Sequence, residues 1–350
     1  MDNIKIRDLT SLAKKRVIPI SVLVEVCYKC NENCIHCFLS NHTKMGMTLN
    51  QYEKLFDQFV EAGTFFVIMT GGEPFLRPDF MQIVAAARKR RLSVTIFTNG
   101  TLLTKEIIGN LKALYVQEVH ISIYSSYEKT HDTITRLKGS FQKSIWAIKE
   151  LSRNGISTRI KCPLTNVSVQ DIAGLKKIAS EFSVEIQFTT VITAKNNGDK
   201  NVHSLRLNQD QLRQALLDPE VSEHTDKPIR FRENADYLPC DTVLNGGSVD
   251  PYGNVYVCNQ WQVKGGNVLQ SSFGEIWKNS KAFHKMRAER LKDLNECKTC
   301  ELFQFCTRCP GLALLEDGDS SGCSSVAKLI AKERRKLTLY PKQLHIFSKI

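Results

Sequence analysis

The chain has 350 residues, of which 42% are hydrophobic, and its formal net charge is +12. This length suits two domains or one large barrel with an appendage, and the composition excludes collagen-like, disordered and membrane-spanning chains, so we expect a cytoplasmic protein without a membrane partner. The positive charge suits a solvated surface or an acidic partner such as a peptide or an anionic cofactor, and no aromatic and basic motif indicates nucleic acid.

The first half of the chain alternates short apolar runs with segments of helical periodicity. Strands are predicted at residues 20–26, 65–70, 93–97, 118–124, 157–162 and 184–189. Helices are predicted around residues 50–62, 80–87, 104–114, 141–154 and 169–181. Six such alternations predict an α/β fold in which a parallel sheet with outer helices curls into a partial (β/α)6 TIM-like barrel. Chemistry in such folds gathers at the carboxyl ends of the strands.

The second half of the chain has a different character. It contains a polar stretch with one helix predicted around residues 209–217, then short strands around a turn at residues 250–253, and finally a basic tail expected to be a solvated helix. The predicted organisation is an N-terminal extension, a barrel, a linker, a cysteine-rich domain and a basic tail, at residues 1–19, 20–193, 194–236, 237–325 and 326–350.

Cysteine usage is the first indication of function. Twelve cysteines are many for a cytosolic protein, in which thiols stay reduced, so they favour metal binding or catalysis over disulfides. Eleven of the twelve lie within residues 27–37 and 240–323, and Cys162 stands alone. Such clustering predicts at least two metal-binding regions.

The first cysteine group follows the first predicted strand and has the spacing C-x3-C-x2-C at Cys30, Cys34 and Cys37. Three thiolates on one loop suit a cubane [4Fe–4S] cluster, which leaves one iron open to bind a substrate or cofactor. One alternative is zinc, which usually takes four ligands in two pairs. Another is a triple that begins at Cys27, which we expect to be a buried thiol at the end of the strand.

Across roughly residues 20–190 the sequence resembles the radical S-adenosylmethionine (SAM) superfamily, of which this cysteine spacing is the hallmark. The resemblance implies that the open iron binds the amino and carboxylate groups of SAM. It also implies that one electron from the cluster cleaves SAM to methionine and a 5′-deoxyadenosyl radical, which abstracts hydrogen from an unactivated carbon.

The segment Gly71, Gly72, Glu73 and Pro74 follows the second predicted strand. Glycines allow close backbone approach, and a carboxylate can accept hydrogen bonds from an ammonium group. Alone, this segment could be an ordinary turn. Together with the cysteine loop it resembles the part of the family that holds the amino group of the methionine moiety of SAM.

Four further residues match positions that contact the cofactor in the family. His36 takes the place of a residue that lies against the adenine. Asn99 follows the third predicted strand, Ser122 lies near the end of the fourth, and Arg136 follows the fourth. The alternatives are a surface imidazole for His36, a plain turn at Asn99 and a surface charge for Arg136. Arg136 stands one place later than in the family, where Thr135 takes its position.

The second cysteine region resembles the SPASM extension, which carries two auxiliary [4Fe–4S] clusters. Five residues separate its middle cysteine pairs, whereas a zinc ribbon places about 15–20 there. Its last pair is C-x2-C, whereas the family usually has C-x3-C. Asp241 is a candidate fourth ligand of the first auxiliary cluster, which is otherwise open. The resemblance implies that the first auxiliary cluster is held by Cys240, Cys258 and Cys309, and the second by Cys297, Cys300, Cys306 and Cys323.

The resemblance implies an oxidoreductase that crosslinks or dehydrogenates a peptide or small protein, as in ribosomal peptide maturation. Since only about 20 residues precede the first predicted strand, a leader-binding protein would be separate, and an electron donor such as flavodoxin or ferredoxin is also expected. The alternatives are radical modification of a small metabolite or cofactor precursor, an iron–sulfur electron-transfer protein, and a zinc-structured nucleic-acid binder. No catalytic residue is assigned, and Tyr124, Asp171 and Glu185 are only generic candidates.

Overall fold

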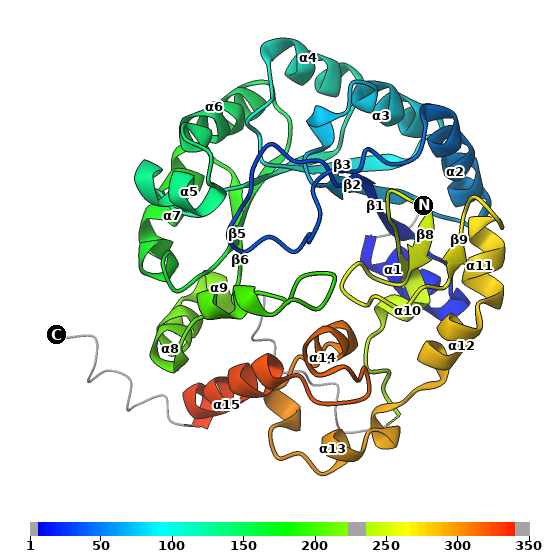
Figure 1. Cartoon of the computed structure of the whole chain (residues 1–350), viewed down its shortest axis with the longest axis vertical. Helices are drawn as coiled ribbons and strands as arrows, with labels where there is room; N and C mark the ends of the chain where they lie inside the picture. The colour runs from blue at the N-terminus through cyan, green and yellow to red at the C-terminus, as the bar shows by residue number, and fades with distance from the viewer. Residues whose placement is uncertain (1–5, 223–235, 340–350) are drawn as a thin grey trace.

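A nine-stranded sheet with helices on its outer face dominates the computed structural model, which describes residues 6–222 and 236–339 (Figure 1). The strand order is β6-β5-β4-β3-β2-β1-β7-β8-β9. The first six strands are parallel, and each pairs with the next one in the chain. They are β1 (Ser21–Cys27), β2 (Phe66–Gly71), β3 (Ser93–Thr98), β4 (Glu118–Ser122), β5 (Thr158–Pro163) and β6 (Glu185–Thr189). The predicted α/β fold with a partial barrel is confirmed.

Helices pack outside the parallel strands because each has one apolar face. In α2, Tyr52, Leu55, Phe56 and Phe59 are fully buried, and their spacing places them on a single side of the helix. The helix begins with a capping box at Thr48. The outer helices are α2 (Leu49–Glu61), α3 (Phe80–Lys89), α4 (Lys105–Ala113), α5 (Glu128–Thr135), α6 (Ser140–Arg153) and α7 (Ile172–Glu181).

The cysteine-rich region continues the barrel sheet. Strand β7 (Gly246–Val249) pairs in parallel with β1, on the side opposite β2. Strands β8 (Asn254–Tyr256) and β9 (Gly266–Asn267) then add antiparallel pairs. This continuity connects the second cysteine region rigidly to the strand that precedes the first cysteine loop.

Helix α11 (Phe273–Asn279) fastens this region to the barrel from outside. The ring of Phe273 lies 4.8 Å from that of Phe59 in α2, and Trp277 Nε1 donates a hydrogen bond to the Val17 carbonyl at 2.7 Å. The remaining helices are α1 (Ile6–Arg16), α8 (Gln209–Leu217), α9 (Pro219–Ser222), α10 (Thr242–Asn245), α12 (Lys281–Ala288), α13 (Asn295–Lys298), α14 (Pro310–Asp317) and α15 (Ser325–Leu339). The helix predicted around residues 209–217 is therefore present as α8.

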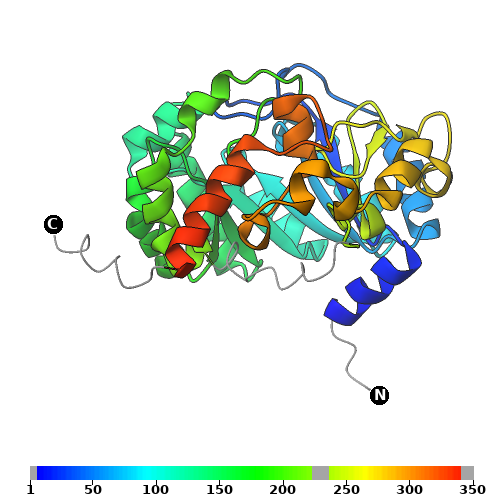
Figure 2. The ribbon, with the colours of Figure 1, turned by 90° about the horizontal axis from the view of Figure 1, so that it is seen from below.

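Helices α14 and α15 lie on the open side of the barrel, with α15 next to α8 (Figures 1 and 2). Val326 and Ile330 are buried, and the buried carboxylate of Glu333 accepts hydrogen bonds from Gln209 Nε2 at 2.8 Å and Arg213 Nε at 2.9 Å. The expectation of a solvated helix beyond Cys323 is therefore wrong for α15, because its apolar face packs against the linker helix. The expected tail beyond residue 339 and the linker residues 223–235 lie outside the described residues.

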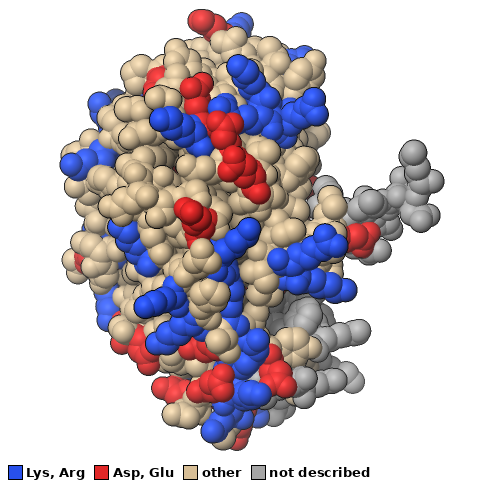
Figure 3. All heavy atoms as spheres, turned by 90° about the vertical axis from the view of Figure 1, so that its right-hand side faces the viewer, with Lys and Arg blue, Asp and Glu red and all other residues tan. Residues whose placement is uncertain are grey.

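Charged side chains do not form one continuous patch on the face that carries α2 and α11. Lys and Arg side chains occur there in several groups with Asp and Glu between them (Figure 3). Within residues 6–222 and 236–339, no helix is long and apolar enough to cross a membrane.

Arg77 ties the long loop between β1 and α2 to the rest of the barrel. Its side chain is buried, and it donates hydrogen bonds to the carbonyl oxygens of Val26 and Met47, both at 2.9 Å, and to that of Met45. It also pairs with Asp79 at 2.8 Å. Arg77 thereby holds the two ends of the loop close together, which fixes the position of the loop's side chains.

We expect Arg77→Met to lower the free energy of unfolding by about 3–5 kcal/mol, because it leaves buried carbonyls and a carboxylate without their donor. Chemical denaturation under anaerobic conditions measures the change. Arg90→Met is the control, since Arg90 pairs with the largely exposed Asp57 and its loss should cost less than about 1 kcal/mol. Equal losses in the two variants would contradict this account of Arg77.

Candidate active site

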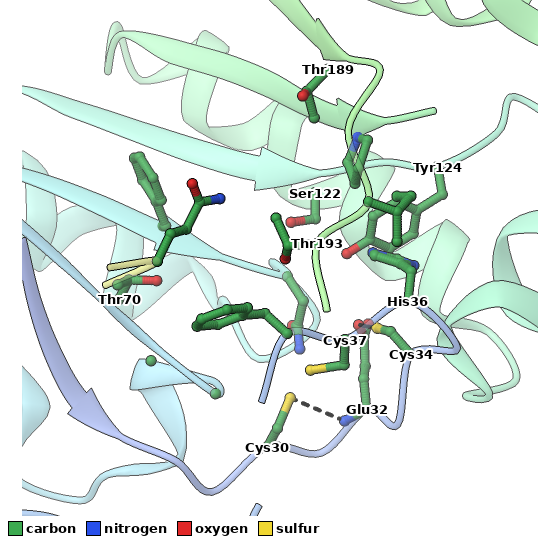
Figure 4. Close-up of a pocket in the computed structure, with 18 of the residues that line it drawn as sticks. Cys30, Glu32, Cys34, His36, Cys37, Thr70, Ser122, Tyr124, Thr189 and Thr193 are labelled. Carbon is green, nitrogen blue, oxygen red and sulfur yellow. Dashed lines mark hydrogen bonds between the residues drawn. The ribbon is translucent and has the colours of Figure 1, made fainter. Parts of the chain in front are cut away.

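A cavity of about 520 Å³ lies at the carboxyl ends of the parallel strands. It is lined by residues at the ends of the strands, such as Thr70 of β2, Phe97 of β3, Ser122 of β4 and Thr189 of β6. The loop after β1 lies over these strand ends and contributes three cysteines (Figure 4). The cavity therefore forms where a parallel sheet usually places its chemistry.

Cys30, Cys34 and Cys37 all line this cavity. Their loop is held by backbone hydrogen bonds to the end of α5, from Asn33 N to the Thr135 carbonyl at 3.1 Å and from Ile35 N to the Ile134 carbonyl at 2.9 Å. The three predicted ligands are thus brought together on one supported loop.

Burial raises the pKa of the Cys30 thiol to about 12 and also raises the pKa values of Cys34 and Cys37. The backbone N–H of Glu32 donates to Cys30 Sγ at 3.4 Å. Buried thiols with such pKa values are protonated near pH 7, and a metal centre must displace these protons to bind thiolates. Soft sulfur donors that face one cavity and accept an N–H bond fit an iron–sulfur cluster. Among the described residues, no group of three or more His, Cys, Asp and Glu side chains is spaced to hold a single metal ion.

Cys27 lies outside the cavity. It is fully buried in β1, and its thiol donates to the carbonyl oxygens of Lys29 at 3.5 Å and Glu73 at 3.4 Å. Burial raises its pKa to about 11. These contacts are those of a buried structural thiol.

Gly71 and Gly72 line the cavity and allow two loops to approach closely. A Cβ on Gly71 would lie 2.1 Å from the Cys27 carbonyl oxygen, and one on Gly72 would lie 2.3 Å from that of Lys29. The backbones are joined there by hydrogen bonds from Gly72 N to the Cys27 carbonyl at 2.8 Å and from Glu73 N to the Lys29 carbonyl at 2.9 Å. The glycines are required because side chains would separate these loops.

Glu73 points into the protein instead of lining the cavity. Its buried carboxylate accepts hydrogen bonds from Thr98 Oγ1 at 2.8 Å, Asn99 N at 2.8 Å and Phe75 N at 3.1 Å. Burial raises its pKa to about 7. Pro74 is also buried and begins a short 3-10 helix. The structure thus gives the Glu73 carboxylate partners within the chain and makes it a support for the loop after β3.

His36, Asn99 and Ser122 line the cavity, as the sequence predicts. The ring of His36 lies edge-on to Tyr124 with 4.6 Å between centroids, and burial lowers its pKa to about 4, so it is neutral near pH 7. Asn99 Nδ2 donates to Asn31 Oδ1 at 2.9 Å and thereby joins the β3 loop to the cysteine loop. His36 and Tyr124 give the cavity an aromatic wall, which suits stacking of a flat aromatic ring such as adenine.

Arg136 does not line this cavity. It is exposed at the end of α5 with φ +57°, and it borders a second hollow of about 480 Å³ on the other side of the cysteine loop, with His42 and Lys195. Of the generic catalytic candidates, only Tyr124 borders the cavity. Asp171 accepts hydrogen bonds from Ser125 and Ser126, and Glu185 pairs with Arg159.

The second cysteine region contains two groups. Burial raises the pKa of Cys258 to about 11, and the nearby Cys309 and Cys240 raise it further. Burial raises the pKa of Cys323, and the nearby Cys297 and Cys300 contribute to the rise. Three cysteines of each predicted set therefore lie near enough to influence one another's pKa values. Cys306 lies at the end of a short 3-10 helix, residues Phe303–Phe305.

The candidate fourth ligand Asp241 is exposed and forms an ion pair with Lys14 of α1. In contrast, Gln260 and Leu312 line the active-site cavity although no sequence motif singled them out. They follow Cys258 by two residues and Cys309 by three. Proximity in sequence to predicted ligands was the signal that could have found them. Residues close in sequence to Cys258 and Cys309 therefore line the same cavity as the first cysteine loop.

Comparisons with known proteins agree with this geometry. Residues 24–176 match the Radical SAM superfamily, and residues 240–301 match SPASM, an iron–sulfur cluster-binding domain. An AdoMet-dependent heme synthase of Methanosarcina barkeri is 25% identical over 329 residues, covering 86% of this chain and 94% of that protein. The mycofactocin maturase MftC of Mycobacterium tuberculosis is 26% identical over 304 residues, covering 82% and 77%. Streptococcus suis SuiB bound to precursor peptide SuiA shares the fold, with a TM-score of 0.70 at 19% identity, covering 92% and 79%.

The contacts of Cys27 and Cys30 predict opposite results when each is replaced. We expect Cys27→Ala to retain the iron bound by the first loop and to lose only about 1 kcal/mol of stability, because it removes one buried sulfur. Cys30→Ala should lose that iron. Iron and sulfide analysis after anaerobic reconstitution, together with the EPR signal of the reduced cluster, measures both. Iron loss in Cys27→Ala but not in Cys30→Ala would favour the alternative triple that begins at Cys27.

Proposed function

We propose that this chain, which belongs to the radical SAM superfamily and carries a SPASM iron–sulfur domain, oxidatively crosslinks or dehydrogenates a peptide or small-protein substrate. Its cofactors are [4Fe–4S] clusters and SAM. When bound, they supply a 5′-deoxyadenosyl radical that removes a hydrogen atom from the substrate. The observation that carries the proposal is that one cavity is lined by both the first cysteine loop and residues beside the auxiliary cysteines.

In this proposal each side of the cavity has a separate task. Cys30, Cys34 and Cys37 hold the first cluster. The wall of His36 and Tyr124 takes the adenine, and the backbone at Gly71 faces the methionine end. Asn99, Ser122 and Gly72 add polar groups around the same space. Glu73 and Pro74 contribute from behind the wall, because Glu73 holds the Asn99 backbone in place.

The auxiliary cysteines would let the substrate lose its second electron. We assign Cys240, Cys258 and Cys309 to a cluster beside the cavity, and the second auxiliary site to Cys297, Cys300, Cys306 and Cys323. A cluster held beside the cavity would accept the electron that a substrate radical loses when it is oxidised, while a proton leaves to water. The product would then be two hydrogens lighter than the substrate.

A peptide substrate is supported by two of the comparisons. MftC is a maturase, and SuiB was solved with a precursor peptide in place. We further propose a separate leader-binding protein and a one-electron donor such as flavodoxin or ferredoxin. All twelve cysteines are free thiols, which suits the reducing conditions of a cytoplasm.

A small-molecule substrate is the second candidate. It is favoured by the similarity to the heme synthase, which extends over nearly the whole length of that protein. SAM cleavage is the same for both candidate functions. They differ in the molecule that the cavity binds beside SAM.

SAM cleavage tests the role of the first cysteine loop. We expect the variant with Cys30, Cys34 and Cys37 all replaced by alanine to lose 5′-deoxyadenosine formation by more than about 100-fold, because no iron is left open for SAM. Liquid chromatography with mass detection of dithionite-reduced protein measures the product. Cys162→Ala is the control, because Cys162 is buried in β5 and should leave the rate unchanged. Undiminished cleavage in the triple variant would refute the proposed site.

The substrate class is tested by incubating the reconstituted enzyme with SAM and candidate precursor peptides. Peptides encoded near the gene are the first choice, and a porphyrin precursor represents the small-molecule class. We expect a peptide to lose about two hydrogens by mass spectrometry, in step with 5′-deoxyadenosine formation. A mass change in the porphyrin precursor, with every peptide unchanged, would favour the second candidate.

A further inference from the structure

Arg308 is a buried cation in the cysteine-rich region. Only 8% of its surface is exposed, and it lies between Cys306 and Cys309 in the sequence. An arginine side chain stays charged in a protein, so its burial requires a compensating partner.

The described residues supply only part of that compensation. The Nη2 of Arg308 donates to the carbonyl oxygens of Gly322, at 3.0 Å, and Ser320. Its Nε and Nη1 are buried without a hydrogen-bond partner, and no carboxylate within residues 6–222 and 236–339 forms an ion pair with it. The contrast with neighbouring arginines is clear, because Arg206 and Arg213 each pair with a buried glutamate.

The position of Arg308 indicates what the missing partner is. It directly precedes Cys309 of the first auxiliary group, and its hydrogen bond to the Gly322 carbonyl anchors it beside Cys323 of the second. Both cysteine groups carry anionic sulfur when they hold iron.

We infer that Arg308 is the counter-cation of the auxiliary clusters and raises the reduction potential of at least one of them. The inference rests on the proposed function, because it assumes that these cysteines hold clusters. One-electron reduction adds a negative charge to a cluster, and a buried cation stabilises that charge more strongly than an exposed one. The charge of Arg308 would thus make that cluster a better electron acceptor.

The test is a redox titration of the full chain after anaerobic reconstitution, followed by EPR. Signals that do not change on addition of SAM report the auxiliary clusters. In Arg308→Gln and Arg308→Met we expect at least a tenfold fall in the ratio of reduced to oxidised auxiliary cluster at a fixed potential, which is about 59 mV for one electron. Arg308→Lys should keep much of the parent value. Lys298→Gln is the control, because it removes an exposed charge next to Cys297 and should shift the ratio far less.

Iron content decides how each result is interpreted. Unchanged auxiliary potentials in either neutral variant with full iron content would overturn the inference. If both neutral variants lose auxiliary iron while Arg308→Lys retains it, a cation is required at this place and the inference is supported. Iron loss in all three variants would overturn it, since the side chain would then serve packing alone. A parent protein without auxiliary clusters would instead refute the proposed function.

Discussion

The close approach of two backbones after β1 and β2 is the constraint on which the site depends. Gly71 and Gly72 have no side chains to separate the loops, so Gly72 and Glu73 donate directly to the carbonyls of Cys27 and Lys29. This contact determines where the chain leaves β1 and therefore where the three thiols of the next residues lie. At the other end of the loop, Arg77 holds the backbone in place by donating hydrogen bonds to the carbonyl oxygens of Val26, Met45 and Met47. Hydrogen bonds of the backbone thus determine where the three thiols lie.

The sheet topology joins the two cysteine regions of the molecule. Strand β7 pairs with β1, so the region that carries the later cysteines is attached to the strand that leads to the first cysteine loop. Helix α14 then begins immediately after Cys309, and its Leu312 reaches the cavity. One cavity is therefore lined both by the first cysteine loop and by residues close in sequence to Cys258 and Cys309.

Several charged groups show that burial, and not the motif to which a residue belongs, decides its contacts. Glu73 belongs to the cofactor segment, yet its carboxylate faces inward because the N–H of Asn99 and the hydroxyl of Thr98 satisfy it there. Arg136 stands one place later than expected, at the left-handed end of α5, and it is exposed beside a second hollow and does not line the cavity. Glu333 is buried in a helix that was expected to be solvated, and its carboxylate forms an ion pair with Arg213 of α8.

The sequence by itself determined the strand and helix order, the family and the cysteine loop, because periodicity, turns and ligand spacing are local properties of the chain. It also located His36, Asn99 and Ser122, since each lies within a few residues of the end of a parallel strand or on the cysteine loop. Only the tertiary structure decided that Gln260 and Leu312 share their cavity, that Arg136 faces another hollow and that Arg308 is buried without a carboxylate. These facts depend on which distant segments pack together, and chain spacing does not encode the side-chain direction and burial that result from such packing.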